Sequence, residues 1–331
     1  MMSLVGVPKP GLSHVMRLDD AISLSRRAAI AGLISAFAPL HPLAAAPATR
    51  AATRLILLGT AGGPRPRRVR SGSAQAIVIG KKAYVIDCGY GVARQLVLAG
   101  IPLRQLRHIF ITHHHSDHNL DLGPLVQLAW MSGLTTPVDC WGPAPIREMI
   151  RDYLRYQQRD IEVRVADEGR TPLAPLIQAH EIRGGGLVVD DGDVRVTSAV
   201  VPHPPLELAF AYRFDARDRS IVISGDTKES DELVKLARGA DVLVHEVMLP
   251  DKVADMLKTL PNHVELTRSV VSHHTSAEEV GRVAAAAGVN TLVLSHFVPA
   301  EDPDVPEAEW LAPVRRHYSG RVVVGRDLME I

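Results

Sequence analysis

The sequence has little cysteine, no excess of charge of either sign and no long uninterrupted apolar run. Its 331 residues include two cysteines, Cys88 and Cys140, too few for a disulfide framework or a cysteine-based zinc site. One disulfide between them stays open. Basic and acidic residues both number 37, so the chain as a whole exerts no electrostatic attraction on nucleic acid. Hydrophobic residues make up 46%, which allows a sizeable core, but they are too interrupted for a membrane protein.

The first 48 residues differ in composition from the remainder. Arg26 and Arg27 precede an apolar stretch and then a run of small residues, which is the order of an export signal of the twin-arginine type. The stretch is broken by Pro39, His41 and Pro42 and is too short for a stable membrane anchor. The sequence therefore predicts a cleaved signal at 1–48, one domain at 49–331 and a periplasmic or secreted protein. The alternative is an N-terminal helix packed on the domain.

Strand-like runs followed by helical patterns occur twice along the rest of the chain. Residues 74–80 and 82–89 predict a hairpin around Gly80 and Lys81. The repeated order predicts an α/β sandwich, with two mixed β-sheets packed face to face and helices outside. Further strands are expected at 54–60, 107–112, 138–141, 176–182, 193–201, 208–214, 220–226, 241–247 and 290–297, and helices at 91–100, 121–133, 144–158, 229–240 and 276–288.

The segment "FITHHHSDHNLDL" (110–122) follows a predicted buried strand and is rich in histidine and aspartate. His113 and His115 are two residues apart, so their side chains leave an extended chain on the same side, whereas that of His114 leaves on the opposite side. Asp117 and His118 follow in the turn. Imidazole and carboxylate ligands without thiolate favour zinc and leave manganese, iron or cobalt open.

One such cluster supplies about four ligands, and a second metal ion needs more. Three further candidates, His203, Asp226 and His296, stand where a predicted strand meets a loop. Folds of the α/β type place their chemistry at such strand ends. Each residue alone is more often structural, but together with the cluster they predict a site for two Zn²⁺ ions per chain.

In order and spacing these seven residues resemble the metallo-β-lactamase superfamily. The resemblance covers residues 54–331 and implies an αβ/βα sandwich with the metal ions at one edge between the sheets. It also implies two ligand sets joined by one bridging carboxylate: His113, His115 and His203 for one ion, Asp117, His118 and His296 for the other, and Asp226 between them.

Other motifs are similar to the branch that contains the transfer-RNA 3′-processing endonucleases and a group of arylsulfatases. They are "LGTAGGPRPRR", "VIDCGYGVARQL", "LAFAYRF", "VISGDT", "LVHEV" and "HHTSAEEVG". In that branch a histidine–glutamate pair assists the leaving group, and the matching residues are His274 and Glu246. Asp117 would orient the attacking water besides binding metal, and His274 would protonate the leaving oxygen. The alternative for His274 is a surface histidine at a helix N-terminus.

The chain departs from the endonucleases at several points. They usually have "GEGTQ" and "HGDH" where this sequence has "GYGVA" (89–93) and "HSDH" (115–118). The segment 158–192 is mixed and acidic, without the glycine-rich basic insertion that clamps transfer RNA, and an exported enzyme would not meet precursor transfer RNA. These differences favour a metal-dependent hydrolase that acts on a small-molecule sulfate or phosphate ester, and they argue against nucleic acid as a partner.

Three other functions stay open: a β-lactam or lactone hydrolase, a ribonuclease, and a non-catalytic metal-binding or di-iron redox protein. The bridging aspartate and the His274–Glu246 pair count against a dedicated β-lactamase. Redox relatives carry glutamate at the position of His115, which counts against that class. A homodimer is left open. The basic loop "PRPRRVR" (64–70) is either a solvated turn or an anion site.

Overall fold

The computed structural model describes residues 52–300 and 305–331. The predicted export signal at 1–48 lies outside these residues, and the localisation and domain boundary that follow from it stay predictions. None of the helices in the described part is long and apolar enough to cross a bilayer. Cys88 and Cys140 are buried free thiols, so the disulfide left open by the sequence does not form.

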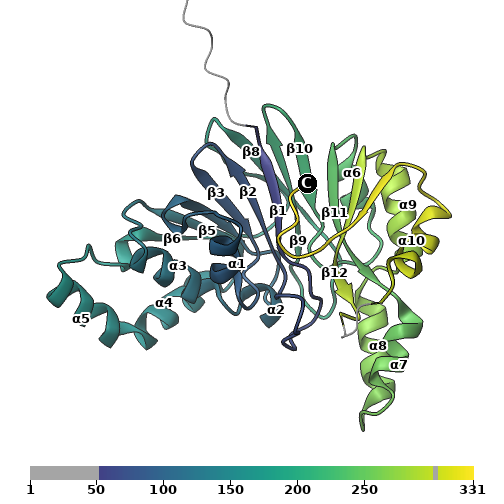
Figure 1. The fold of residues 1–331 in the computed structure, drawn as a ribbon, viewed down its shortest axis with the longest axis horizontal. Helices are drawn as coiled ribbons and strands as arrows, with labels where there is room; N and C mark the ends of the chain where they lie inside the picture. The colour runs from purple at the N-terminus through teal and green to yellow at the C-terminus, as the bar shows by residue number, and fades with distance from the viewer. Residues whose placement is uncertain (1–51, 301–304) are drawn as a thin grey trace, which may run out of the picture. The chain divides into compact units, whose positions relative to one another are not determined.

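Two mixed β-sheets make up the centre of the described chain (Figure 1). The first has six strands in sequence order: β1 (Arg54–Gly59), β2 (Ala74–Ile79), β3 (Lys82–Ile86), β4 (Leu106–Phe110), β5 (Val138–Pro143) and β6 (Ile177–Ile182). The second has the spatial order β13-β12-β11-β10-β9-β8-β7 and comprises β7 (Gly186–Asp190), β8 (Val194–Val200), β9 (Phe210–Ala216), β10 (Ser220–Ile223), β11 (Val242–Met248), β12 (Thr291–Val298) and β13 (Arg321–Val324). The predicted hairpin is confirmed, because β2 and β3 pair antiparallel around Gly80 and Lys81.

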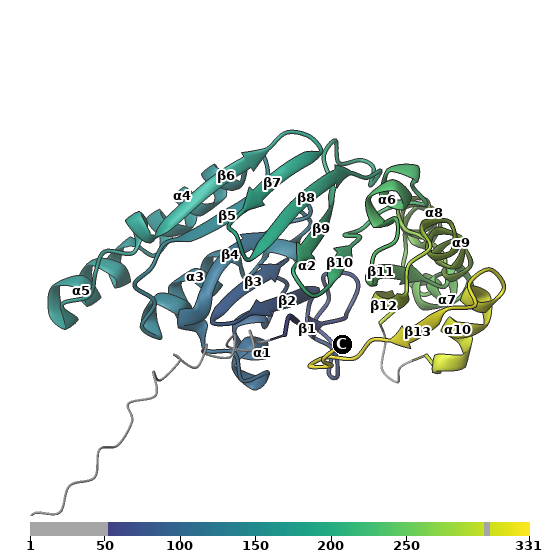
Figure 2. The ribbon, with the colours of Figure 1, turned by 90° about the horizontal axis from the view of Figure 1, so that it is seen from above.

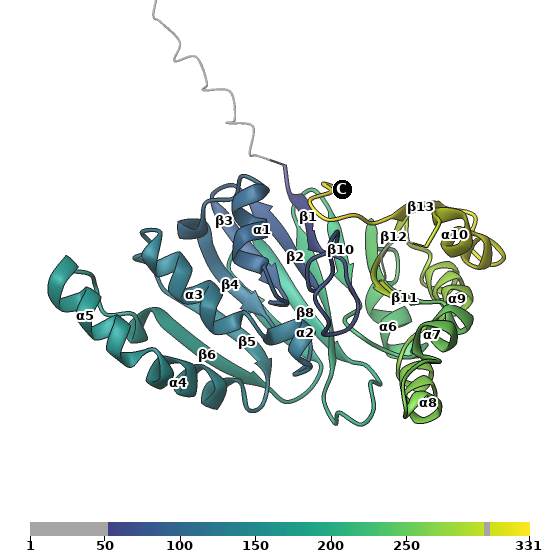
Figure 3. The same cartoon turned by 60° about the horizontal axis from the view of Figure 1, so that its bottom comes forward.

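Helices cover the outer face of each sheet (Figures 2 and 3). Helices α1, α3 and α4 contribute Leu96, Leu125 and Ile146 to the core under the first sheet, and α6, α9 and α10 pack against the second. The helices are α1 (Val92–Leu98), α2 (Ser116–Asn119), α3 (Leu122–Met131), α4 (Ile146–Tyr156), α5 (Gln158–Glu168), α6 (Asp231–Ala237), α7 (Pro250–Leu257), α8 (His263–His273), α9 (Ala277–Ala287) and α10 (Glu307–Arg315). The predicted sandwich with helices outside is confirmed.

Aromatic side chains fill the space between the sheets. Phe210, Tyr212 and Phe214 alternate along β9 and are buried, as the period of two in a strand requires. The ring of Phe110 on β4 lies 5.4 Å from that of Tyr212 and 5.2 Å from that of Phe214, centroid to centroid. Burying each such ring contributes roughly 1.5–3 kcal/mol, so this layer fixes how the two sheets face each other.

Both sheets contain parallel strands whose carboxyl ends lie at one edge. Strands β3 to β6 are parallel in the first sheet, and β10 to β13 in the second. Loops that leave the ends of parallel strands meet at the same edge. The histidine-rich segment after β4 and the residues after β10 are therefore brought together between the sheets.

The C-terminal segment returns to the first strand of the chain. The backbone amides of Leu328 and Ile331 donate to Leu57 O and Leu55 O on β1, at 2.7 and 2.9 Å. The Asp327 carboxylate accepts from the amides of Thr60 and Ser71, at 3.0 and 2.6 Å. The last residues thus hold β1 and the loop that follows it.

Gly89 stands where three backbone segments meet, and it generates a stability prediction. Its amide donates to Ser73 O at 3.0 Å, and a methyl group on it would collide with Asp117 O and the Gly72 backbone. We expect Gly89→Ala to lower the free energy of unfolding by about 1–3 kcal/mol in urea titrations. Gly184→Ala is the matched control, because no heavy atom lies within 4 Å of its Cβ position. Equal losses in both variants would contradict this account.

Candidate metal centre

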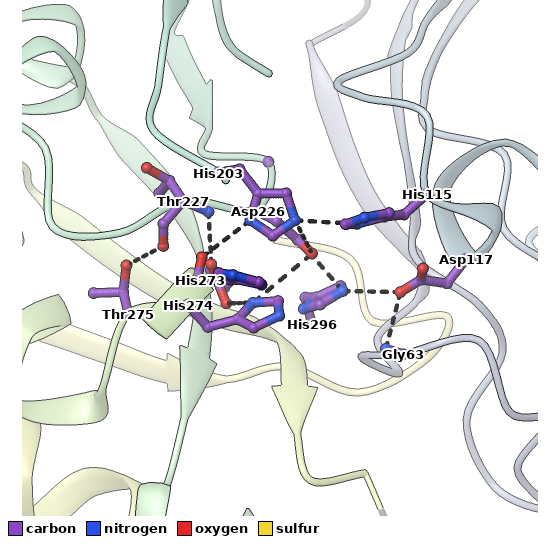
Figure 4. A network of polar contacts seen from close by, with 12 residues as sticks. Gly63, His115, Asp117, His203, Asp226, Thr227, His273, His274, Thr275 and His296 are labelled. Carbon is purple, nitrogen blue, oxygen red and sulfur yellow. Dashed lines mark hydrogen bonds and ion pairs between the residues drawn. The ribbon is translucent and has the colours of Figure 1, made fainter. Parts of the chain in front are cut away.

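The seven residues singled out in the sequence come together at the sheet edge between β4, β10 and β12. His113 and His115 leave the end of β4, and Asp117 and His118 lie on the short helix α2. His203 and Asp226 follow β8 and β10, and His296 lies on β12 (Figure 4). Within the described chain, three groups of possible metal ligands share Asp226, and the ligand atoms of each group lie within 4.8 Å of one another. The first two groups contain all seven residues.

Three imidazoles form the first group. His115 Nδ1 lies 3.0 Å from His113 Nε2 and 3.1 Å from His203 Nε2. An imidazole nitrogen either donates one hydrogen or accepts through one lone pair. His115 Nδ1 therefore cannot form full hydrogen bonds to both His113 Nε2 and His203 Nε2. Tetrahedral zinc with Zn–N bonds of about 2.0–2.1 Å places its ligand nitrogens about 3.3 Å apart. The spacing therefore suits a cation bound to all three nitrogens.

The second group adds carboxylates to two imidazoles. His118 Nε2 and His296 Nε2 lie 3.1 Å apart, and Asp117 Oδ2 lies 3.3 Å from His296 Nε2. Asp226 Oδ1 lies 3.3 Å from both ring nitrogens, whereas its Oδ2 faces His113 Nε2 at 3.9 Å. Asp226 thus presents one oxygen to each group, and its Oδ1 is buried without a hydrogen-bond partner.

Outer contacts fix which nitrogen of each ring faces inward. His118 Nδ1 donates to Asp87 Oδ2 at 2.7 Å. Thr112 Oγ1 donates to the same carboxylate at 2.9 Å and lies 3.0 Å from His113 Nδ1, from which it accepts. His203 Nδ1 donates to the carbonyl oxygen of His273 at 3.0 Å. The Nε2 lone pairs of His113, His118 and His203 therefore point into the centre, as metal ligation requires.

The electrostatic setting distinguishes the two groups. Burial lowers the pKa of His113 well below its ordinary value, and lowers that of His203 to about 4, so both rings are neutral and able to bind a cation. Burial alone would also lower the pKa of His118, but Asp226 and Asp87 raise it well above its ordinary value. A proton therefore competes with a metal ion at His118. The donors suit metal ions such as zinc, and the count of two ions stays a prediction.

His114 is directed away from the centre. Its Nε2 donates to the carbonyl oxygen of Pro143 at 2.8 Å, and its Nδ1 lies 3.1 Å from the side-chain amide of Asn119. Both ring nitrogens of His114 thus have hydrogen-bond partners in the protein, Pro143 and Asn119, and are not directed toward the metal ligands.

His274 and Glu246 form a buried pair beside Asp226. His274 Nδ1 donates to Glu246 Oε2 at 2.7 Å, and Glu246 Oε1 accepts from the amide of Thr227 at 2.7 Å. Burial would lower the pKa of His274, but the Glu246 carboxylate raises it to about 9. His274 is largely buried and caps the C-terminal end of α8, so it is not a surface histidine at a helix start. With Asp226 and His296 these two residues form the third group, whose ligand atoms also lie within 4.8 Å of one another.

A cavity of about 650 Å³ adjoins both groups. His115, Asp117, His203, Asp226 and His274 line one side of it. Loop residues Arg65 and Arg67 and apolar residues of α7 and α8 line the remainder. Sequence reasoning did not identify this helical wall, nor the supporting roles of Asp87 and Thr112. The only signal for Asp87 was its place in "VIDCG" at the end of a strand.

The contrasting orientations of His114 and His115 generate a prediction about metal binding. We expect His115→Ala to weaken zinc binding by at least about 100-fold, the upper end for changes around metal ligands. His114→Ala should keep the metal content of the wild type, because its ring contacts Pro143 instead. Elemental analysis after dialysis against a zinc buffer measures both. Equal metal loss in the two variants would show that the register is wrong.

Comparisons with known proteins agree with this geometry. Residues 82–297 match the family described as "Beta-lactamase superfamily domain". The chain is 32% identical over 280 residues to "Ribonuclease Z" of Mycobacterium bovis (strain BCG / Pasteur 1173P2), covering 84% of this chain and 97% of the relative. It is 34% identical over 278 residues to "Ribonuclease Z" of Mycobacterium avium (strain 104), covering 83% and 96%.

Two solved structures share the fold at lower identity. The metallo-β-lactamase fold protein YhfI from Bacillus subtilis has a TM-score of 0.63 and 19% identity, over 84% of this chain and 98% of its own. Human tRNase Z, short form, has a TM-score of 0.61 and 22% identity, over the same shares of the two chains.

The relatives overturn one expectation from the sequence. They are ribonucleases, so the expected small-molecule ester substrate and the argument against nucleic acid as a partner are wrong. The physical reason is that net charge averages over the whole chain, whereas phosphates meet only local charge, such as Arg65 and Arg67 at the cavity. The chain is a metal-dependent hydrolase and belongs to the ribonuclease Z branch of the metallo-β-lactamase superfamily.

Proposed function

We propose that this chain is an endoribonuclease of the ribonuclease Z type, which hydrolyses a phosphodiester bond at the 3′ end of precursor transfer RNA. The observation that carries the proposal is the near full-length match to relatives of that name, at 32–34% identity over 94–97% of their length. The site geometry supports it, because two adjoining ligand groups suit a phosphoryl-transfer centre.

The residues that would hold metal ions divide into the two groups described above. His113, His115 and His203 would bind one ion, Asp117, His118 and His296 the other, and Asp226 both. Divalent ions bound there supply a nucleophilic water at neutral pH and offset the negative charge of the phosphate. Zinc fits the nitrogen-rich donor set, and manganese, iron or cobalt remain alternatives.

Asp117 would orient the attacking water and accept its proton. Its Oδ2 accepts from the amide of Gly63 at 2.9 Å, which fixes the carboxylate at the cavity wall. Burial would raise its pKa, but His118 and His296 hold the pKa well below its ordinary value. The carboxylate is therefore ionised at neutral pH and ready to accept a hydrogen bond from water.

His274 would donate a proton to the leaving oxygen. A ribose alkoxide is a poor leaving group and gains more from protonation than a phenolate does. The His274 ring lines the cavity, and with a pKa of about 9 it carries a proton at neutral pH. Glu246 would act as a positioning residue, because it holds Nδ1 and directs Nε2 toward the site.

The proposed function is tested with precursor transfer RNA that carries a 3′ trailer. We expect the zinc-loaded protein to release the trailer, and chelation of the metal to abolish release. Asp117→Asn should reduce the rate by roughly 10²–10⁴-fold, the usual contribution of a general base. If the protein hydrolyses bis(p-nitrophenyl) phosphate but does not cleave the precursor, the ribonuclease function is rejected and only a phosphodiesterase activity remains.

The acid role of His274 predicts a dependence on the leaving group. We expect His274→Ala to cut turnover of alkyl phosphodiesters by roughly 10²–10⁴-fold, and the loss to shrink as the leaving group becomes more acidic. Glu246→Gln should show the same trend more weakly. The measurement is log turnover against leaving-group pKa at saturating zinc, with metal content checked in each variant. Parallel lines for wild type and variant would contradict the acid role.

A further inference from the structure

The cavity beside the candidate metal centre has one strongly apolar side. Met256, Leu257 and Leu260 from α7 and the turn after it, with Leu266 and Val270 from α8, line it together with Asp117 and His115. We call these five side chains the α7–α8 wall. In Figures 1 and 3 the two helices project together beyond the ends of β11 and β12. Metal binding requires polar ligands and does not account for this apolar surface, so the surface requires a separate explanation.

The inner side of the α7–α8 wall belongs to a small hydrophobic cluster. Leu257 is buried with Val253, Met248 and Val298, so the inner side of the wall is anchored to the ends of β11 and β12. Met256 packs against this cluster, whereas Leu260 is 37% exposed at the turn between the helices. Met256 and Leu260 both line the cavity, and neither is one of the buried members of this cluster.

Charge surrounds the apolar surface on two sides. Arg65 and Arg67 of the basic loop line the same cavity, and the Arg65 guanidinium donates to the Met256 sulfur at 3.2 Å. A ligand in the cavity would thus meet cationic groups at the loop, the two groups of metal ligands and the apolar side chains of the wall. A nucleotide has this pattern, since its phosphates are anionic and its base has an apolar face.

The α7–α8 wall lies beside His274, which is the proposed proton donor for the leaving oxygen. Helix α8 ends at His273, and His274 follows directly as its C-cap. The proton donor for the leaving oxygen therefore stands at the foot of the wall. The nucleoside that carries the leaving oxygen would extend from His274 along α8 toward Met256 and Leu260.

We infer that the α7–α8 wall is a base-binding subsite, which packs the unpaired base of the nucleoside that bears the leaving oxygen. The inference rests on the proposed ribonuclease function and adds to it a requirement for a base at one position. An unpaired base is the form in which proteins ordinarily recognise RNA by stacking and apolar contact. A paired base would keep its face stacked within the duplex and could not lie against the wall.

Cleavage of RNAs with a single abasic residue tests the subsite. The abasic residue is placed immediately 5′ or immediately 3′ of the cleaved bond, and the product that carries the phosphate shows which oxygen left. On the leaving side we expect kcat/KM to fall roughly five- to fiftyfold, because the apolar face of the base is then no longer buried against the wall. The same change on the other side should have a smaller effect. Equal effects on both sides, or none, would overturn the inference.

Variants of the wall provide the second arm. In Met256→Ala/Leu260→Ala, intact RNA and leaving-side abasic RNA should have similar kcat/KM values, because the base no longer has the two apolar side chains to pack against. Val264→Ala is the matched control, since Val264 lies on α8, is 62% exposed and does not line the cavity. This variant should keep the wild-type preference. Loss of the preference in Val264→Ala to the same extent would show that the helices matter only structurally.

A binding measurement separates the subsite from the proposed function. The zinc-loaded protein is titrated with the 3′- and 5′-monophosphates of 2-aminopurine riboside, which contain no diester bond, and base fluorescence is followed. We expect Met256→Ala/Leu260→Ala to weaken binding of one of them about tenfold, with no change in Val264→Ala. If no RNA is cleaved but this difference is found, the ribonuclease function fails and the subsite stands. Unchanged binding of both nucleotides in the double variant would overturn the subsite.

Discussion

The site depends on one buried carboxylate, that of Asp226, placed among imidazoles from both halves of the chain. Its side chain is almost inaccessible to solvent, and its two oxygens face different groups of ring nitrogens. A desolvated carboxylate is costly unless cationic partners surround it. The position of Asp226 at the end of β10 therefore ties the second sheet to the histidine segment that leaves β4 of the first.

The backbone around this carboxylate is held in conformations that the sequence alone would not favour. Asp87 and His296 have φ angles of 61° and 45°, which cost about 1–2 kcal/mol each for residues with a Cβ atom. Both are fixed by contacts around the site. Asp87 accepts from the Thr112 amide at 2.8 Å as well as from His118, and His296 meets Asp117 and Asp226. The layer of aromatic rings between the sheets supplies stability that offsets this strain.

The sequence predicted most of the fold because its signals are local. The strand β9 and the turn at Gly80 can be predicted from residues that are adjacent in sequence. The same holds for the opposite side-chain directions of His114 and of His113 and His115. The roles of Asp87 and Thr112 depend on contacts across the sheet, and the α7–α8 wall depends on where two helices project. Apart from the place of Asp87 at the end of a strand, neither has a local signature in the sequence. The partner was misjudged because the balanced total charge, the missing clamp insertion and the expected export outweighed the basic loop 64–70, which places Arg65 and Arg67 at the cavity.

The return of the C-terminal segment to β1 affects the order in which the chain can complete its fold during synthesis. Leu328 and Ile331 are made long after Leu57 and Leu55 of β1, to which they bond. Asp327 likewise holds Thr60 and Ser71, which flank the loop beside the cavity. Because a chain folds from its N-terminus as it emerges from the ribosome, β1 lacks these bonds until residues 327–331 have also emerged. The basic loop at the cavity therefore reaches its final position only after residues 327–331 have left the ribosome.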